Sequence, residues 1–294
     1  MAGYLMFDLV FALFFVGAAG FCIYSYLLIV QQREQQKMLC SIQSLPAIVL
    51  KSVQTPDLPV PVKRYFHLTC IDQIERLPCL EIQISGVWRP KKGLPSIPIH
   101  GNIFYAINRP CFLELLSFST WPHILKTILF KQSVNEGQIE ERFLSVFSIR
   151  KESGFYIQKM GLLKYFFEAV WFPWIFRPSL YLNWEPIDDL CARFTVSDSL
   201  IPLNFIVKFD ESGLIKEMIS ESSIGFFDDL TPNTTFIAIY GGYCEVRGML
   251  IPREIKIFRD DRCDENLYQH LILVSYQNTM VYEIALSDEN YKPI

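Results

Sequence analysis

The sequence predicts an α+β, β-rich fold: a large twisted antiparallel sheet or incomplete β-barrel with one or two packed helices, preceded by a single N-terminal transmembrane helix. Three observations support this prediction. From about residue 80 onward, many segments alternate apolar and polar residues with the period of two that is typical of strands. Helical periodicity is confined to a few short segments, and the first 30 residues contain a long uncharged run.

The composition indicates a folded protein that does not bind nucleic acid. Of the 294 residues, 51% are hydrophobic and 20% are charged, which is not the composition of a disordered chain. The net charge is -4, whereas proteins that bind nucleic acid usually carry a strongly basic surface. We therefore expect no nucleic-acid partner.

The uncharged run extends from Leu9 to Val30 and predicts a membrane anchor. A helix of this length extends roughly 33 Å, enough to cross a hydrocarbon core of about 30 Å. A cleaved signal peptide would need a basic region before the run, but residues 1–8 contain Asp8 and neither Lys nor Arg. We expect an uncleaved anchor whose partner is the lipid bilayer, through residues 9–30.

Basic residues near the anchor predict its orientation. Arg33, Lys37 and Lys51 follow the run, and no basic residue precedes it. Under the positive-inside rule, the C-terminal side then faces the cytoplasm. The sequence predicts a single-pass membrane protein with its large domain in the cytoplasm.

The chain divides into three predicted parts. Residues 1–31 are the anchor, residues 32–61 are a juxtamembrane helix and a proline-rich linker, and residues 62–294 are a single β-rich domain. Prolines 46, 56, 59 and 61 interrupt any helix in the linker. A short helix is expected at Val62–Leu68, where the domain begins.

The domain contains a series of segments that read as strands. They are Leu80–Trp88, Ile99–Ile107, Phe143–Ile149, Phe155–Lys159, Ala192–Ser197, Leu203–Phe209, Leu214–Ser220, Phe236–Val246, Met249–Phe258, Leu267–Tyr276 and Met280–Leu286. Turn-forming residues at 151–154, 210–213 and 259–262 predict hairpins and therefore antiparallel pairing. Helical patterns occur at Trp121–Lys131 and Gly161–Phe172, too few for a doubly wound parallel sheet.

The most unusual segment is Met160–Phe176, which is rich in aromatic residues and carries two charges, Lys164 and Glu168. One interpretation is a core helix packed under the sheet. The other is a helix that lies at the membrane interface or lines an apolar ligand cavity. On the second interpretation, the candidate ligand-binding residues are Tyr165, Phe167, Trp171, Phe172 and Trp174.

Glu168 is the best candidate for a functional carboxylate. Burial would raise its pKa and suit it to general acid catalysis, whereas pairing with Lys164 or Arg193 would make it structural. Asp188 and Asp189 are further candidates, although adjacent acids often cap or turn the chain before a strand. A hydrolase or isomerase that uses Glu168 with Asp188 or Asp189 requires these carboxylates to converge in a cleft.

Motifs for other chemistry are absent from the sequence. The four histidines, His67, His100, His123 and His270, form no metal-binding pair. No glycine-rich phosphate loop and no GxSxG motif occurs. We expect no metal and no cofactor, and the sequence favours a protein that is not an enzyme.

Several segments resemble a family. These are residues 58–66 (LPVPVKRYF), residues 165–173 (YFFEAVWFP) and residues 184–189 (WEPIDD), followed by Phe209-Asp210, Gly213, Gly248 and Ile251-Pro252. Together they resemble an uncharacterised, mostly bacterial family marked by an L-x-E-x-V-W-F-P signature. Phe167 and Cys111 depart from the family pattern. The resemblance implies a strand-rich fold and no known activity.

The leading functional hypothesis is a membrane-anchored protein that binds an apolar ligand, such as a lipid or an acyl chain, in a curved sheet. A filled interior with no cavity of at least a few hundred Å³ would count against it. One alternative is the carboxylate enzyme described above. Another is a membrane-associated assembly or interaction protein that docks a partner through an exposed aromatic patch at residues 160–176.

Overall fold

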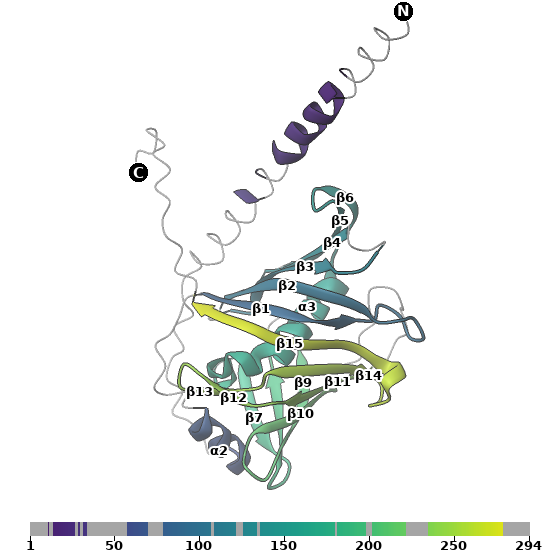
Figure 1. Ribbon diagram of the computed structural model, residues 1–294. Helices are drawn as coiled ribbons and strands as arrows, with labels where there is room; N and C mark the ends of the chain where they lie inside the picture. Colours follow the sequence, from purple (N-terminus) through teal and green to yellow (C-terminus); the bar gives the residue numbers. More distant parts are fainter. Residues whose placement is uncertain are drawn as a thin grey trace, which may run out of the picture.

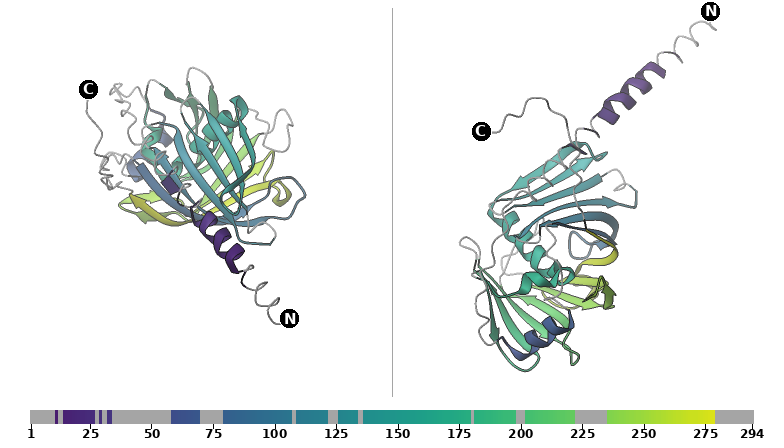
Figure 2. Two further views of the ribbon diagram at one scale, coloured as in Figure 1. Left: turned by 90° about the horizontal axis from the view of Figure 1, so that it is seen from above. Right: turned by 90° about the vertical axis from the view of Figure 1, so that its left-hand side faces the viewer.

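A single large antiparallel sheet curves around one buried helix. The computed structural model describes residues 11, 14–26, 29, 32–33, 58–69, 79–106, 109–121, 126–133, 136–179, 181–197, 202–221 and 235–278. The sheet has 13 strands and wraps helix α3 (Phe155–Glu168), as Figures 1 and 2 show. This confirms the predicted β-rich α+β class with a twisted antiparallel sheet.

Neighbouring strands in the sheet all pair antiparallel. From one edge to the other, the order is β6 (Phe147–Ser153), β5 (Gly137–Phe143), β4 (Lys126–Gln132), β3 (Cys111–Phe118), β2 (Ile97–Ala106), β1 (Cys79–Trp88), β15 (Leu267–Asn278), β14 (Glu254–Arg259), β11 (Phe236–Gly241), β10 (Ile215–Ser220), β9 (Leu203–Phe209), β8 (Cys191–Val196) and β7 (Leu182–Pro186). Because β1 pairs with both β2 and β15, the earliest and latest described strands meet in the middle of the sheet.

A small hairpin connects β11 to β14 along the chain. It consists of β12 (Cys244–Val246) and β13 (Met249–Ile251), which form a separate two-stranded sheet. Arg247 and Gly248 at its tip have φ angles of 53° and 79°. Two successive positive φ angles are the geometry of a type I′ turn, a common two-residue hairpin connection.

Helix α3 lies in the concave side of the sheet because it is apolar on nearly every face. Ten of its residues are buried, which is typical of a helix enclosed by a core. Gly154 precedes it with a φ of 124°, a value that lets the chain turn from β6 into the helix. Two short 3-10 helices follow, η3 (Ala169–Trp171) and η4 (Pro173–Phe176).

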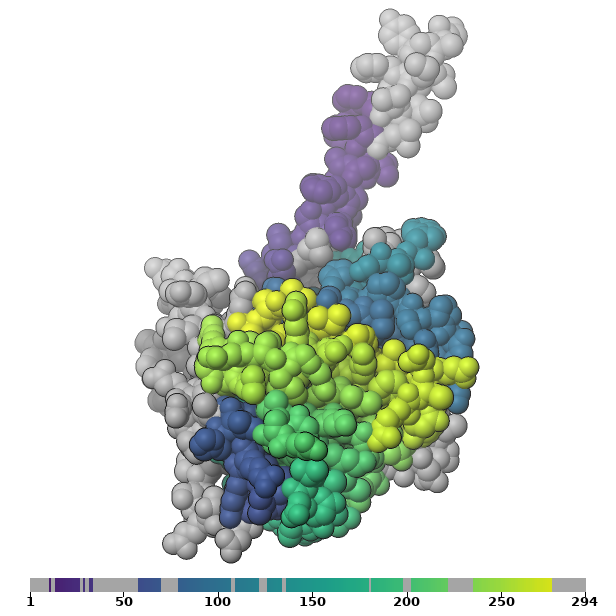
Figure 3. Space-filling model, turned by 60° about the horizontal axis from the view of Figure 1, so that its bottom comes forward, coloured from purple at the N-terminus to yellow at the C-terminus, as the bar shows by residue number. Residues whose placement is uncertain are grey.

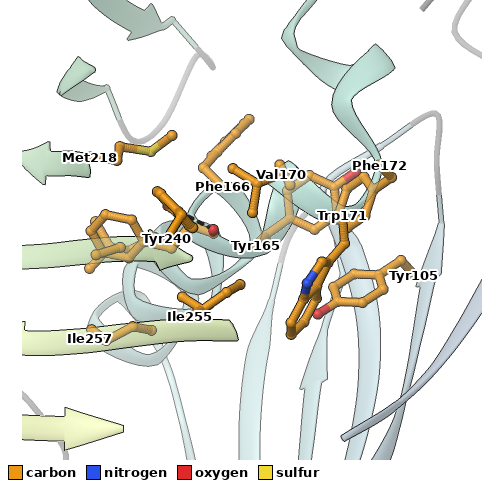
Figure 4. Close-up of a cluster of buried hydrophobic side chains, with 14 of the residues drawn as sticks. Tyr105, Tyr165, Phe166, Val170, Trp171, Phe172, Met218, Tyr240, Ile255 and Ile257 are labelled. Atoms are coloured by element: carbon orange, nitrogen blue, oxygen red, sulfur yellow. Dashed lines mark hydrogen bonds between the residues drawn. The ribbon is translucent and has the colours of Figure 1, made fainter. Parts of the chain in front are cut away.

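Aromatic side chains tie this helical segment to the sheet. Figure 4 shows Phe166, Val170 and Trp171 directed into the same interior as Tyr240 and Ile257 of the sheet. The Trp171 indole donates a hydrogen bond to the Pro252 carbonyl at 2.9 Å. The Tyr240 hydroxyl donates to the Phe167 carbonyl at the same distance. These bonds satisfy polar atoms that burial would otherwise leave without a partner.

Helix α2 (Val60–Leu68) packs beside the strands β8 to β10. Tyr65 is fully buried, and its ring lies 6.4 Å from that of Phe176 and 6.0 Å from that of Phe209. In Figure 3, α2 (dark blue) lies on the surface against the green part of the chain that carries these strands. The predicted short helix at 62–68 is confirmed, with two further residues at its start.

Four predicted elements differ from the structure. The described part of the predicted helix at 121–131 is strand β4, because residues 126–132 pair with β3 on one side and β5 on the other. The predicted strand at 155–159 is the first part of α3, where five alternating residues lead into a continuous apolar helix. The predicted strand at 143–149 spans the turn between β5 and β6, and the predicted hairpin at 151–154 is the entry to α3.

Four strands were not predicted, namely β3, β4, β5 and β7. Strand β3 (CFLELLSF) has a burial pattern in which both faces are largely covered. A strand covered on both faces loses the alternation that identifies a half-buried strand. Pairing with neighbours distant in the sequence therefore decides its conformation.

The N-terminal region carries helical residues 14–26 with exposed apolar side chains, including Phe14, Val16 and Phe21. None of the helices in the described ranges is long and apolar enough to cross a membrane. The predicted span at 9–30 includes positions outside those ranges, as do most of the predicted linker and the predicted strand at 280–286. The anchor and the cytoplasmic location remain predictions.

Candidate functional site

A cavity of about 70 Å³ lies between α3 and the concave face of the sheet. Strands β3, β4 and β5 contribute Leu116, Phe130 and Ile139, and α3 contributes Met160 and Leu163. On the opposite side the lining residues are Phe236, Ile257 and Tyr268, from β11, β14 and β15. The described wall is therefore largely apolar, as the walls of small-molecule sites usually are.

Two charged side chains reach this cavity, Glu114 from β3 and Lys164 from α3. The Lys164 Nζ lies 2.9 Å from Glu114 Oε1 and also contacts Glu168 Oε1, one helical turn further along α3. The three side chains are 12%, 3% and 0% exposed, in the order Lys164, Glu114, Glu168. The buried ammonium group of Lys164 thus forms ion pairs with two buried carboxylates.

Glu168 is held by two partners. Lys164 pairs with its Oε1 atom, and the Tyr105 hydroxyl donates a hydrogen bond to its Oε2 atom at 2.6 Å. Both oxygen atoms are therefore occupied, and Glu168 does not line the cavity. The structure shows the pairing with Lys164 that the sequence offered as the structural alternative.

The second carboxylate differs from Glu168. The pKa of Glu114 is raised to about 7: burial raises it most, the Lys164 charge lowers it, and the Glu168 charge raises it. Burial alone would lower the pKa of Lys164, but the charges and hydrogen bonds of the two carboxylates outweigh burial and raise that pKa. Lys164 therefore stays protonated, and Glu114 exchanges its proton near neutral pH.

The predicted ligand-binding residues mostly form core instead of cavity wall. Tyr165, Trp171 and Phe172 are fully buried, and the rings of Tyr165 and Phe172 lie 5.3 Å apart. Trp174 is 9% exposed and packs near Phe172, at 6.2 Å between ring centroids. Phe167 is the one member of the predicted set that lines the described cavity.

This packing also bears on the predicted interaction patch. The aromatic side chains of residues 160–176 are directed inward, with Trp171 and Phe176 fully buried. The segment therefore offers no exposed aromatic surface among these residues. Of the interpretations that the sequence left open, the core helix describes most of the segment, and one edge of α3 forms a cavity wall.

Asp188 and Asp189 have different surroundings from the buried Glu168. Both are exposed in the turn between β7 and β8, where Asp188 Oδ1 accepts a hydrogen bond from the Leu190 backbone N–H at 2.8 Å. Glu168, the last residue of α3, is fully buried and contacts Tyr105 of β2. The structure does not bring these carboxylates together, so the convergence required by the hydrolase or isomerase hypothesis is not found.

The residue that sequence reasoning missed is Glu114. It is the acidic residue in an otherwise apolar and weakly polar run, CFLELLSF, and this isolation was a usable signal. Its partner Lys164 is 50 positions away, so only the packing of α3 on β3 reveals the pair. Within the described ranges, no cluster of three His, Cys, Asp or Glu side chains could hold a metal ion.

Comparisons with solved structures find only distant likenesses. A LolA superfamily protein from Nitrosomonas europaea aligns with 76% of this chain and 93% of its own, at 9% identity and a TM-score of 0.43. A domain from Vibrio parahaemolyticus, described as an outer membrane lipoprotein-sorting protein, gives the same coverage and TM-score at 6% identity. A DUF1329 family protein from Desulfovibrio piger covers 78% and 96%, at 10% identity and a TM-score of 0.34.

Structural similarities this distant do not indicate a function for this protein. No curated protein sequence matches the chain. A family model does match it, over residues 49–271, which include α2, the whole of α3, the Glu114–Lys164 pair and the described sheet up to the first part of β15. The chain therefore belongs to DUF6544, a family of unknown function.

Proposed function

We propose that this protein is a membrane-anchored binding protein that holds a small apolar group in the cavity between α3 and the sheet. The observation that carries the proposal is the apolar wall of that cavity, formed by strands from both sides of the sheet and by one edge of α3. Protein interiors are normally packed without voids of this kind, because unfilled space forfeits dispersion contacts.

The size of the cavity limits the ligand. Its volume of about 70 Å³ is below the few hundred Å³ that the sequence-based hypothesis required, and this counts against binding of a whole lipid. We therefore propose a ligand of a few carbon atoms, or the end of an acyl chain whose remainder lies outside the cavity. A longer segment would require α3 to withdraw from the sheet.

The packing of α3 opposes such withdrawal. At Gly137 of β5, a Cβ atom would lie only 2.5 Å from the backbone nitrogen of Gln158 in α3. Glycine at this position allows the helix and the strand to touch along their backbones. The cavity beside this contact is consequently a fixed feature of the arm formed by β3, β4 and β5.

The partial exposure of three lining residues supports access of a ligand to the cavity. Trp88, Ile128 and Tyr268 line the cavity and are each half-buried, so the cavity wall continues to the surface at these residues. The predicted anchor at residues 9–30, with its exposed apolar side chains, would hold this opening near a source of apolar ligands.

The test uses the full chain in nanodiscs, labelled with 13C at the methionine methyl groups. Met160 lines the cavity. Met218, in β10, is fully buried, does not line the cavity and serves as an internal control. Titration with butan-1-ol is expected to shift the Met160 signal saturably and to leave Met218 unchanged. Equal shifts at both, or none at Met160, would contradict the proposal.

A matched pair of variants tests the location. Leu116→Phe fills the cavity, and Leu203→Phe makes the same enlargement in the filled part of the core, where Leu203 is fully buried. Leu116→Phe is expected to abolish the Met160 response with a change in stability below about 1 kcal/mol. Leu203→Phe should cost about 1–3 kcal/mol through overpacking and retain the response.

A further inference from the structure

We infer that the cavity selects a ligand with a cationic end, such as a protonated amine, and that the Glu114 carboxylate receives it. This inference rests on the proposed function and assigns the chemistry of the ligand's polar end. It follows from the position and charge of three buried side chains, Glu114, Lys164 and Glu168.

The first step concerns charge. Glu114 and Glu168 together carry two negative charges when both are ionised, and Lys164 supplies one positive charge between them. The cluster therefore retains one negative charge inside an apolar wall. A buried charge without a full counter-charge is unfavourable, so a cation delivered by a ligand would be stabilised there.

The second step concerns which group is available. Both oxygen atoms of Glu168 are occupied, by Lys164 and by Tyr105. Among the described residues, the polar contact to Glu114 is made by Lys164, through Oε1. Glu114 is also the carboxylate that lines the cavity. Its second oxygen atom is thus the acceptor that a donor on the ligand can reach.

The third step excludes an anionic end. Lys164 lines the cavity too, but its ammonium group already contacts two carboxylates. A ligand carboxylate beside Lys164 would become the third negative charge around a single positive one. The geometry therefore disfavours fatty acids relative to amines and alcohols of the same length.

Protonation of Glu114 should control the preference. The groups that face Glu114 are Lys164 and Glu168 of α3, Tyr105 of β2 and Tyr268 of β15. Burial raises the pKa of both tyrosines, so they remain neutral over the range of interest. Below about pH 7, Glu114 takes up a proton and loses its negative charge, and with it the attraction of this carboxylate for a cation.

The experiment compares n-butylamine, butan-1-ol and butyrate, with the same Met160 signal in the full chain at pH 8 and pH 5.5. At pH 8 the amine is expected to bind roughly tenfold more tightly than the alcohol, since hydrogen bonds to charged groups are stronger than neutral ones. Butyrate should bind more weakly than the alcohol. At pH 5.5, and in Glu114→Gln at pH 8, the preference for the amine should disappear.

The controls separate this inference from the proposed function. Glu141→Gln removes a partly exposed carboxylate that pairs with Lys126 outside the cavity, and it should retain the preference. If the alcohol binds and the amine binds no more tightly, the inference is overturned while the proposed function stands. If butyrate binds most tightly, Lys164 is the receptor and the inference is again overturned. If none of the three compounds binds, the inference and the proposed function are both contradicted.

Discussion

The two arms of the sheet enclose the same helical segment in different ways. Around β7 to β10, aromatic rings fill the interior: Phe194 lies 5.2 Å from Trp184, 5.3 Å from Phe205 and 5.3 Å from Phe166, measured between ring centroids. Around β3 to β5, the interior contains a cavity and the buried Glu114–Lys164 pair. The interior of the first arm resembles an ordinary core, whereas the interior of the second contains a cavity with buried charges.

This difference separates a closely packed part of the sheet from a part that contains a cavity and buried charges. Closely packed aromatic rings contribute dispersion and burial energy, so the filled arm can hold the segment from α3 to η4 in place. An unfilled space and a buried charge both reduce stability. Their occurrence together on one arm is what we would expect if that arm has a role other than packing.

The largest loss of stability should come from removing an aromatic ring from the filled arm, around β7 to β10. Phe194→Ala is expected to lower the free energy of unfolding by about 4 kcal/mol, because the ring contacts neighbours on several sides and leaves a cavity. Phe130→Ala in the hollow arm should cost about 1–2 kcal/mol less, since part of that ring already faces the cavity. Urea denaturation measures both, and equal losses would remove the proposed distinction between the arms.

The next effect concerns the buried charges. Lys164→Met leaves Glu114 and Glu168 without their shared cation, and should lower the free energy of unfolding by about 3 kcal/mol at pH 7. The matched control is Lys126→Met, which breaks a more exposed pair with Glu141 and should cost less than about 1 kcal/mol. Similar losses in the two variants, measured by thermal or urea unfolding, would mean that the cluster is not effectively buried.

The smallest effect is a dependence on pH. The pKa of Glu114 is about 7 in the folded protein and near 4.5 in the unfolded chain, so the folded state binds this proton more tightly. Its contribution to stability is therefore greatest below about pH 4.5 and is lost as the pH rises through 7.

The comparison of wild type with Glu114→Gln isolates this contribution. Relative to the variant, the wild type should lose about 2 kcal/mol of unfolding free energy between pH 5 and pH 8. Urea titrations at several pH values give the difference. Parallel pH profiles for the two proteins would show that Glu114 has an ordinary pKa, and the proton-controlled selectivity would lose its basis.

The pattern of residues along the chain was sufficient to predict the fold class and much of the strand content. Alternation of apolar and polar residues correctly located β1, β2, β8, β9, β10, β11, β14 and β15, because each of these strands has one face more buried than the other. The turn at 210–213 was also predictable, because Asp210 accepts hydrogen bonds from the turn and Gly213 has a φ of 96°. The pairing of Glu168 with Lys164 followed from their helical spacing.

The unpredicted strands and the candidate site depend on residues that are distant in the sequence and meet in the folded protein. Strand β3 is covered on both faces, so its sequence lacks alternation and its conformation depends on partners in the sheet. The aromatic segment that suggested a binding surface is mostly core, since nothing local distinguishes a ring facing a cavity from one facing other rings. Glu114 became a candidate only when α3 packed on β3 and brought Lys164 to it, because charge and burial at a site are properties of residues that meet in space.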